Sequence, residues 1–110
     1  MQRVTGIGGI FIKARDAGRL REWYREHLGL PIADWGGVVE RVQRDTRYFE
    51  PSTSPFMINY RVDDLDGVLA ALRAEGCEVD PRIEESEFGR LGWVMDPEGN
   101  KLELWEPPRV

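Results

Sequence analysis

The sequence predicts an α+β domain built from two similar units, each with a strand, a helix and antiparallel strands. The first observation is an internal repeat. "GGIFIKARDAGRLREWYREHLGLP" from Gly8 and "FMINYRVDDLDGVLAALRAEGCEVD" from Phe56 both run through an apolar segment, an Asp, a helical stretch and a Gly. The second observation is spacing, because Asp16 and Asp64 take the same place in the two copies, 48 positions apart. The third is "DPEGN" at 96–100, a turn signal between two extended runs. Two such units in one small domain predict a cleft between them.

Length and composition limit the classes of function. The 110 residues, 41% hydrophobic and 32% charged, predict one globular domain. No apolar run approaches the roughly 20 residues of a membrane helix, and the N-terminus lacks a signal-peptide pattern, so we expect no membrane association. Cys77 is the only cysteine, which excludes an intrachain disulfide and predicts a cytoplasmic protein. The net charge of −5 argues against nucleic acid as a partner.

The first unit begins with an apolar run over residues 7–14 that predicts a strand. Asp16 is the expected N-cap of the following helix, because its side chain can accept a hydrogen bond from an otherwise unpaired amide. Apolar residues then recur at helical spacing until Gly29 ends the helix. Residues 38–43 predict another strand and residues 46–51 a weaker one, so this unit is expected to be shortened.

The second unit has the clearer pattern. Residues 56–62 predict a strand, Asp63 or Asp64 predicts the N-cap of a helix, and Gly76 predicts its end. Further strands are predicted over residues 78–80, 90–95 and 101–106. The order is therefore a strand, a helix and antiparallel strands, as in the first unit.

Alternation along the strands predicts which side chains share one face of the sheet. Leu104 should face the helices, which leaves Glu103 on the other face, and the register of the turn puts Trp93 opposite Glu103. By the same rule one face, the cup face, holds Phe11, Lys13, Met57, Asn59, Arg61, Leu91, Trp93, Glu103 and Trp105. An apolar, aromatic surface with few polar groups is typical of a small-molecule site. The alternatives are that a second copy of the chain covers this face, or that a one-residue register shift inverts the set.

Three segments together resemble the vicinal-oxygen-chelate superfamily, the glyoxalase/bleomycin-resistance/dioxygenase group. They are "ARDAGRLREWYREHLGLP", "YRVDDLDGVLAALRAEGCEV" and "WVMDPEGNKLELWEP", and they span most of the chain. The resemblance implies one glyoxalase-like domain over residues 1–110, with two βαβββ modules at about 5–52 and 55–107. It also implies that their sheets form a cupped mixed sheet, often completed by dimerisation. Enzymes of this group bind a divalent metal through one residue from the first and one from the last strand of each module.

The resemblance also implies that the metal site is largely lost here. The ligand position on the first strand of module one is Gly9, which has no side chain, and the matching position in module two is Met57, a poor ligand for such metals. Glu103 is the only retained ligand position. The remaining ligand would fall at Arg47, which cannot bind a metal, and Glu40 is the nearest carboxylate. We therefore expect no cofactor beyond a weakly bound divalent metal.

Three roles of Glu103 are compatible with the sequence. It is a general base for isomerase- or lyase-type proton chemistry, the partner of Lys13 or Arg61 in an ion pair, or a vestigial ligand. Lys13 and Arg61 would also suit the carboxylate of a substrate. His27, in the last turn of the predicted helix, is expected to have a structural role. The leading hypothesis is a glyoxalase-like protein that binds a small organic ligand, with Glu103 as its catalytic residue.

Other functions follow from the same resemblance. Relatives of the bleomycin-resistance type trap an aromatic, cationic drug in an acidic, Trp-rich dimer groove without catalysis. The four Trp residues and the net charge of −5 fit this alternative, whereas Lys13 and Arg61 argue against it. A third hypothesis, an interaction module without a ligand, predicts a filled cup. Tyr48 and Phe49 are expected to pack over the cup or to close it as a flap. A homodimer is expected in each case.

Overall fold

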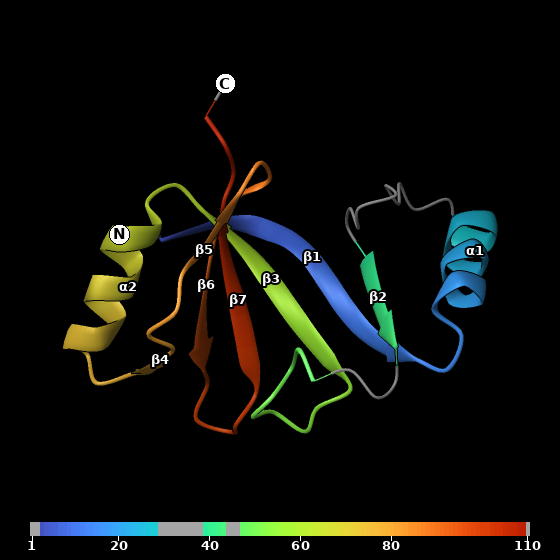
Figure 1. The fold of residues 1–110 in the computed structure, drawn as a ribbon, viewed down its shortest axis with the longest axis horizontal. Coiled ribbons are helices and arrows are strands. Elements are labelled where there is room, and N and C mark those ends of the chain that lie inside the picture. Colours follow the sequence, from blue (N-terminus) through green and yellow to red (C-terminus); the bar gives the residue numbers. More distant parts are fainter. Residues whose placement is uncertain (1–2, 29–38, 44–46, 110) are drawn as a thin grey trace.

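The computed structural model describes residues 3–28, 39–43 and 47–109, which adopt the α+β fold that the sequence predicts (Figure 1). These residues form a seven-stranded mixed sheet with the strand order β2-β1-β3-β7-β6-β4, in which β5 also pairs with β6. The elements are β1 (Val4–Ala14), α1 (Ala17–Leu28), β2 (Val39–Gln43), β3 (Phe56–Val62), α2 (Leu65–Ala74), β4 (Glu78–Val79), β5 (Glu84–Ser86), β6 (Gly89–Met95) and β7 (Lys101–Glu106). Figure 1 shows α1 and α2 at opposite ends of the sheet. Neither of these helices is long and apolar enough to cross a membrane.

In the second unit, β7 lies between β3 and β6, and this arrangement sets the neighbours of Glu103. β3 and β7 run parallel with Asn59 opposite Glu103, and β6 and β7 run antiparallel with Trp93 opposite Glu103. The second pairing confirms the register predicted from the "DPEGN" turn. In that turn the Asp96 amide donates to the Asn100 carbonyl at 2.9 Å, which closes the hairpin. Side chains directly opposite each other in neighbouring strands are close enough to interact.

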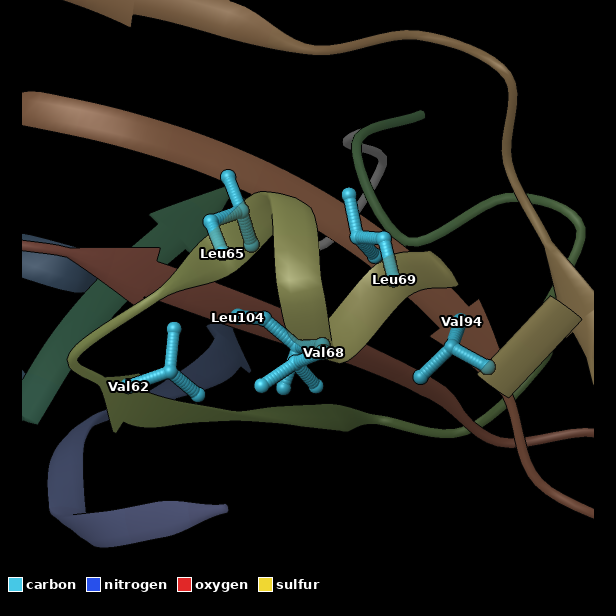
Figure 2. Packing of buried hydrophobic residues seen from close by; sticks show 6 residues of the cluster. All are labelled: Val62, Leu65, Val68, Leu69, Val94 and Leu104. Carbon is cyan, nitrogen blue, oxygen red and sulfur yellow. The ribbon is translucent and has the colours of Figure 1, made fainter. Parts of the chain in front are cut away.

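Helix α2 covers one face of this unit. It begins at the predicted N-cap, where the Asp64 side chain accepts a hydrogen bond from the Gly67 amide at 3.1 Å, and it ends before Gly76, whose φ of +83° favours glycine. Figure 2 shows the buried cluster beneath the helix, which consists of Val62, Leu65, Val68, Leu69, Val94 and Leu104. Complete burial of a leucine contributes about 1.5–3 kcal/mol. This cluster therefore holds α2 on the face opposite the predicted cup.

Strand β1 joins the two units, because it pairs antiparallel with β3 and parallel with β2. Helix α1 begins at its predicted N-cap, where Asp16 Oδ1 accepts a hydrogen bond from the Arg19 amide at 3.0 Å. The helix leaves apolar side chains in solvent, since Trp23 is 49% and Leu28 58% exposed. The predicted end of this helix at Gly29 lies outside the described residues.

The weak strand predicted over residues 46–51 is wrong. From Arg47 onward the chain turns, and the Glu50 amide donates to the Arg47 carbonyl at 3.1 Å. Hydrogen bonding to a residue three positions back replaces the pairing between strands that a sheet requires. Pro51 has no amide hydrogen to donate to a sheet. The segment therefore leaves the sheet, and its aromatic side chains pack on the cup face.

The corrected strand assignment moves the expected ligand position of the first unit. The parallel neighbour of β1 is β2, and its register places Glu40 opposite Phe11. Phe11 and Asn59 are 48 positions apart, so Glu40 takes the backbone position in the first unit that Glu103 takes in the second. The expectation that Arg47 holds this position is wrong, because Arg47 lies in the turn.

Candidate functional site

The cup face carries a second buried cluster, separate from the one beneath α2. Phe49, Met57 and Trp93 are each 1% exposed and pack together. Three half-buried residues pack against them, namely Phe11, Tyr48 and Leu91. Alternation along β3, β6 and β7 therefore divides the side chains between the two faces as the sequence predicts. Tyr48 and Phe49 pack over the centre of this face, as one of the two expectations for them has it, but they do so from a turn and not from a strand.

Glu103 lies at the centre of this face and is 1% exposed. Its Oε1 accepts a hydrogen bond from Asn59 Nδ2 at 2.7 Å. Its Oε2 accepts one from Trp93 Nε1 at 2.9 Å and another from the hydroxyl of Tyr48. A buried carboxylate is costly unless hydrogen bonds replace its water, and bonds to a charged acceptor are the stronger kind. These three donors therefore make the buried position of Glu103 tenable.

The sequence offered Lys13 or Arg61 as ion-pair partners of Glu103, and the structure places neither of them there. Lys13 Nζ lies 5.2 Å from the centre of the Phe49 ring. Arg61 is exposed, and the described residues include no ion pair between Glu103 and a cation. Hydrogen bonds from uncharged side chains hold the carboxylate instead.

Tyr48 closes the site from the turn side. Its ring meets Trp93 edge-on at 6.3 Å between centres and lies 5.8 Å from Phe11. Burial, and then the charge of Glu103, raises the pKa of the Tyr48 hydroxyl well above its usual value. The hydroxyl therefore stays protonated at neutral pH and acts as a donor. The sequence predicted that Tyr48 and Phe49 either pack over the cup or close it as a flap. The observed contacts of Tyr48 with Trp93 and Phe11 are packing contacts.

Lys101 is a buried cation on the same face. It is 4% exposed, and its Nζ donates to the Tyr48 carbonyl at 2.7 Å. The ammonium also lies 5.3 Å from the ring centres of both Tyr48 and Trp93. Burial lowers the pKa of Lys101, and the positive charge of Arg82 lowers it further. Lys101 lies two residues before Glu103 on β7, so alternation puts both on the same face, but Lys101 was not among the predicted ligand-binding residues.

A pocket of about 230 Å³ opens beside Lys101, at the end of the sheet. Its lining consists of Pro51, Glu78, Val79, Asp80, Pro81, Trp93, Val94, Met95 and Lys101. Trp93 thus separates the pocket from Glu103, since its ring lines the pocket while its Nε1 bonds to the carboxylate. The Arg82 guanidinium also lies over the Trp93 ring, 5.1 Å from its centre.

Comparison with known families decides where the chain belongs. Residues 9–105 match the family described as "Glyoxalase-like domain". The chain belongs to this family. No curated protein sequence matches it.

Solved structures share the glyoxalase-like fold at low identity. Methylmalonyl-CoA epimerase from Mycobacterium tuberculosis is 21% identical, with 99% of this chain and 92% of the other covered at a TM-score of 0.73. A glyoxalase/bleomycin resistance protein/dioxygenase superfamily member from Vibrio splendidus 12B01 is 13% identical, with 89% and 96% covered at 0.60. A catechol 2,3-dioxygenase is 18% identical at a TM-score of 0.71, with 99% of this chain and 43% of the other covered. These similarities show a shared fold, and the family match over residues 9–105 confirms the glyoxalase resemblance that the sequence motifs indicated.

The described residues of this glyoxalase-like chain do not fit a divalent metal. They include no group of three His, Cys, Asp or Glu side chains that could bind an ion. Both oxygens of Glu103 already accept hydrogen bonds, and Met57 is buried in the apolar cluster. The expected ligand position on the first strand is Gly9, which has no side chain to offer. The side chain of Glu40 lies outside the described part of the chain.

The other predicted ligand-binding residues are divided between the centre and the edge of the glyoxalase-like cup face. Phe11, Leu91 and the buried Asn59 surround the centre with the residues described above. Trp105 lies toward one end, where its Nε1 donates to the Phe88 carbonyl at 2.7 Å. Asn59 Oδ1 is buried without a hydrogen-bond partner in the described structure. An amide with one unpaired end can reverse its orientation when its partner changes.

Proposed function

We propose that this glyoxalase-like protein binds a small organic molecule on its cup face, with Glu103 as the polar centre of the site. The observation that carries the proposal is the buried carboxylate itself. A hydrophobic pair would fill the same space at lower cost, because removing a charge from water is expensive even when it is hydrogen-bonded. An aromatic surface with one fixed polar group has the composition of a small-molecule site.

The proposed reaction is a proton transfer of the isomerase or lyase type. Displacement of Tyr48 would free a lone pair on Glu103 Oε2, while Trp93 and Asn59 keep the carboxylate in place. A carbonyl compound with an acidic C–H bond could then give its proton to Oε2. A positioned general base contributes about 10²- to 10⁴-fold to such a step. The similarity to the fold of a methylmalonyl-CoA epimerase is compatible with this class of reaction.

One observation favours a non-catalytic binder as the second candidate. The two oxygens of Glu103 accept hydrogen bonds from three donors, so the carboxylate has no free position while Tyr48 is in place. A ligand would then contact the aromatic side chains alone, as in the bleomycin-resistance type of protein. This candidate predicts binding without proton exchange.

Exchange of carbon-bound hydrogen tests the reaction without knowledge of the substrate. The protein is incubated in D₂O with methylmalonyl-CoA, hydroxyacetone and pyruvate, and loss of the proton signal next to each carbonyl is followed by NMR. The wild type should accelerate exchange in at least one probe, and Glu103→Gln should lose about 100-fold or more of this rate. The exposed Glu98→Gln variant is the matched control and should behave as wild type.

The Gln substitution suits this site. A glutamine oxygen can accept from Trp93 and Tyr48, and its NH₂ group can face Asn59 if that amide reverses to present Oδ1. Exchange by Glu103→Gln at the wild-type rate would exclude Glu103 as the base. Tryptophan fluorescence changes with these probes, but no exchange in the wild type, would favour the binder. No exchange and no binding would refute the proposed function.

We also propose that the protein is a homodimer, in which a second copy covers apolar side chains of α1. Trp23 and Leu28 are both largely exposed on this helix. Light scattering after size exclusion should give twice the chain mass of 12.7 kDa. Trp23→Glu should shift the mass toward the monomer, and a monomeric wild type would contradict this proposal.

A further inference from the structure

Lys101 is a buried cation on the cup face. None of the ion pairs in the described part of the chain includes it. A lysine ammonium has three N–H donors, and one of them bonds to the Tyr48 carbonyl at 2.7 Å. The two aromatic rings at 5.3 Å attract the charge but accept no conventional hydrogen bond. Buried charges are normally paired. The charges of Asp80, Glu103 and Glu84 partly offset the lowering of the pKa of Lys101, but none of these carboxylates forms an ion pair with this 4% exposed lysine.

The pocket beside Lys101 has the size and lining to supply that anion from a ligand. Its volume of about 230 Å³ is below the range of roughly 300–1,000 Å³ for drug-sized ligands, so only a smaller molecule would fit. Apart from Lys101, most of the lining is apolar, with the Trp93 ring, two prolines, two valines and Met95. A ligand that fits has one anionic group and an apolar body.

Two acidic residues at this pocket restrict the charge of the ligand. Asp80 is partly neutralised, because its Oδ1 accepts from the Arg82 amide at 2.8 Å and lies 3.6 Å from Arg82 Nε. Glu78 is exposed and has no such partner among the described residues. Both carboxylates repel negative charge on a ligand, so they would repel a dianion more strongly than a monoanion. The pocket therefore suits a monoanion better than a phosphate or a dicarboxylate.

We propose that this pocket binds the carboxylate of a small, singly charged organic acid, with Lys101 as the cation and the Trp93 ring against the apolar body. The site is distinct from the proposed proton-transfer centre, since Trp93 lies between the pocket and Glu103. The proposal does not depend on any catalytic role of Glu103. Lys13 and Arg61, which the sequence suggested for a substrate carboxylate, do not line this pocket.

Amide NMR with matched probe pairs tests this inference on the full chain. Benzoate and isovalerate are titrated against the ¹⁵N-labelled protein, and benzamide and isovaleramide serve as uncharged matches of the same shape. The acids should shift the Trp93 indole signal and the amides of Val79, Asp80, Val94 and Met95. Each acid should bind at least about 10-fold more tightly than its amide, which corresponds to about 1.4 kcal/mol. Inorganic phosphate should not compete.

Variants distinguish binding of the acid by Lys101 from attraction to positive charge elsewhere on the surface. Lys101→Met should weaken acid binding by about 10-fold or more and bring it to the affinity of the amides. Arg25→Met removes a positive charge on α1 and should leave the affinity unchanged. Glu103→Gln should also retain acid binding, which distinguishes failure of this inference from failure of the proposed reaction.

The comparison of acid with amide on the wild type stands even if Lys101→Met does not fold. The inference is overturned if acids and amides bind equally, if the shifts lie away from the pocket, or if no acid binds at millimolar concentration. Retained affinity in a folded Lys101→Met variant would overturn it as well.

Discussion

The hydrogen bond from Tyr48 to Glu103 should make a large contribution to stability for a single hydroxyl group. Tyr48→Phe removes one oxygen atom and keeps the ring that packs against Trp93 and Phe11. The variant leaves Glu103 Oε2 with only the Trp93 donor, in a position from which water is excluded. The loss of stability therefore measures the lost hydrogen bond to the buried carboxylate and depends much less on packing.

The magnitude follows from this geometry. A hydrogen bond to a charged group contributes about 1.5–3 kcal/mol. The lower part of this range applies, because the Trp93 and Asn59 donors remain. For a domain of this length, 1 kcal/mol corresponds to about 4 °C in the melting temperature. Tyr48→Phe should therefore lower the melting temperature by about 6–10 °C.

Urea unfolding and calorimetry measure this loss, with Tyr60→Phe as the matched control. Tyr60 lies on the α2 face, and its hydroxyl has no hydrogen-bond partner in the described structure, so its removal should change stability by less than about 0.5 kcal/mol. Equal effects of the two substitutions would refute the reasoning. A wild-type crystal structure with Tyr48 turned away from Glu103 would refute it too.

Three further substitutions or conditions test separate parts of the structure. Gly8→Ala should lower the free energy of unfolding by about 1–3 kcal/mol, because its Cβ would overlap Asn59 Oδ1. Gly18→Ala is the control, since an added Cβ there has its nearest neighbour at 3.7 Å, and urea unfolding compares the two variants. Leu69→Ala should cost about 2–5 kcal/mol in the same assay, since this side chain is 1% exposed in the cluster beneath α2. Above about pH 10 the wild type should lose stability as the pH rises, because the raised pKa of Tyr48 means that the unfolded chain releases this proton first. Tyr48→Phe should remove that part of the pH dependence, as measured by unfolding at neutral and alkaline pH.

The second unit could be predicted from sequence because its signals are local. The Asp64 cap, the helical spacing of the α2 leucines and the "DPEGN" turn each determine structure within a few residues. Strand alternation then assigned the faces, and the turn register placed Trp93 opposite Glu103. The short strand β5 was missed, since "EES" has neither apolar alternation nor β-branched residues and pairs only at the edge of the sheet.

The centre of the site could be predicted only in part, because its remaining partners depend on tertiary structure. Glu103 was identified, but its donor Tyr48 lies 55 positions away on a turn that the sequence suggested as a strand. Apolar residues in a turn give the same sequence pattern as a strand, because in both cases they are buried against other parts of the fold. Charge complementarity also misled, since it favoured Lys13 or Arg61 as partners of Glu103, and uncharged donors hold the carboxylate instead.

The same donor set leads to a prediction about metals. To bind a divalent ion, the Glu103 carboxylate would have to direct a lone pair at it. Here Asn59, Trp93 and Tyr48 direct N–H and O–H groups at both oxygens, and a cation would have to displace at least one of them. A ligand that binds only the folded state at 100 times its dissociation constant adds about 2.7 kcal/mol of stability. Millimolar Mg²⁺, Mn²⁺ or Ni²⁺ should instead leave the melting temperature unchanged, with or without EDTA. A rise that disappears in Glu103→Gln would mean that the cation displaces these donors and binds Glu103, which would contradict this prediction.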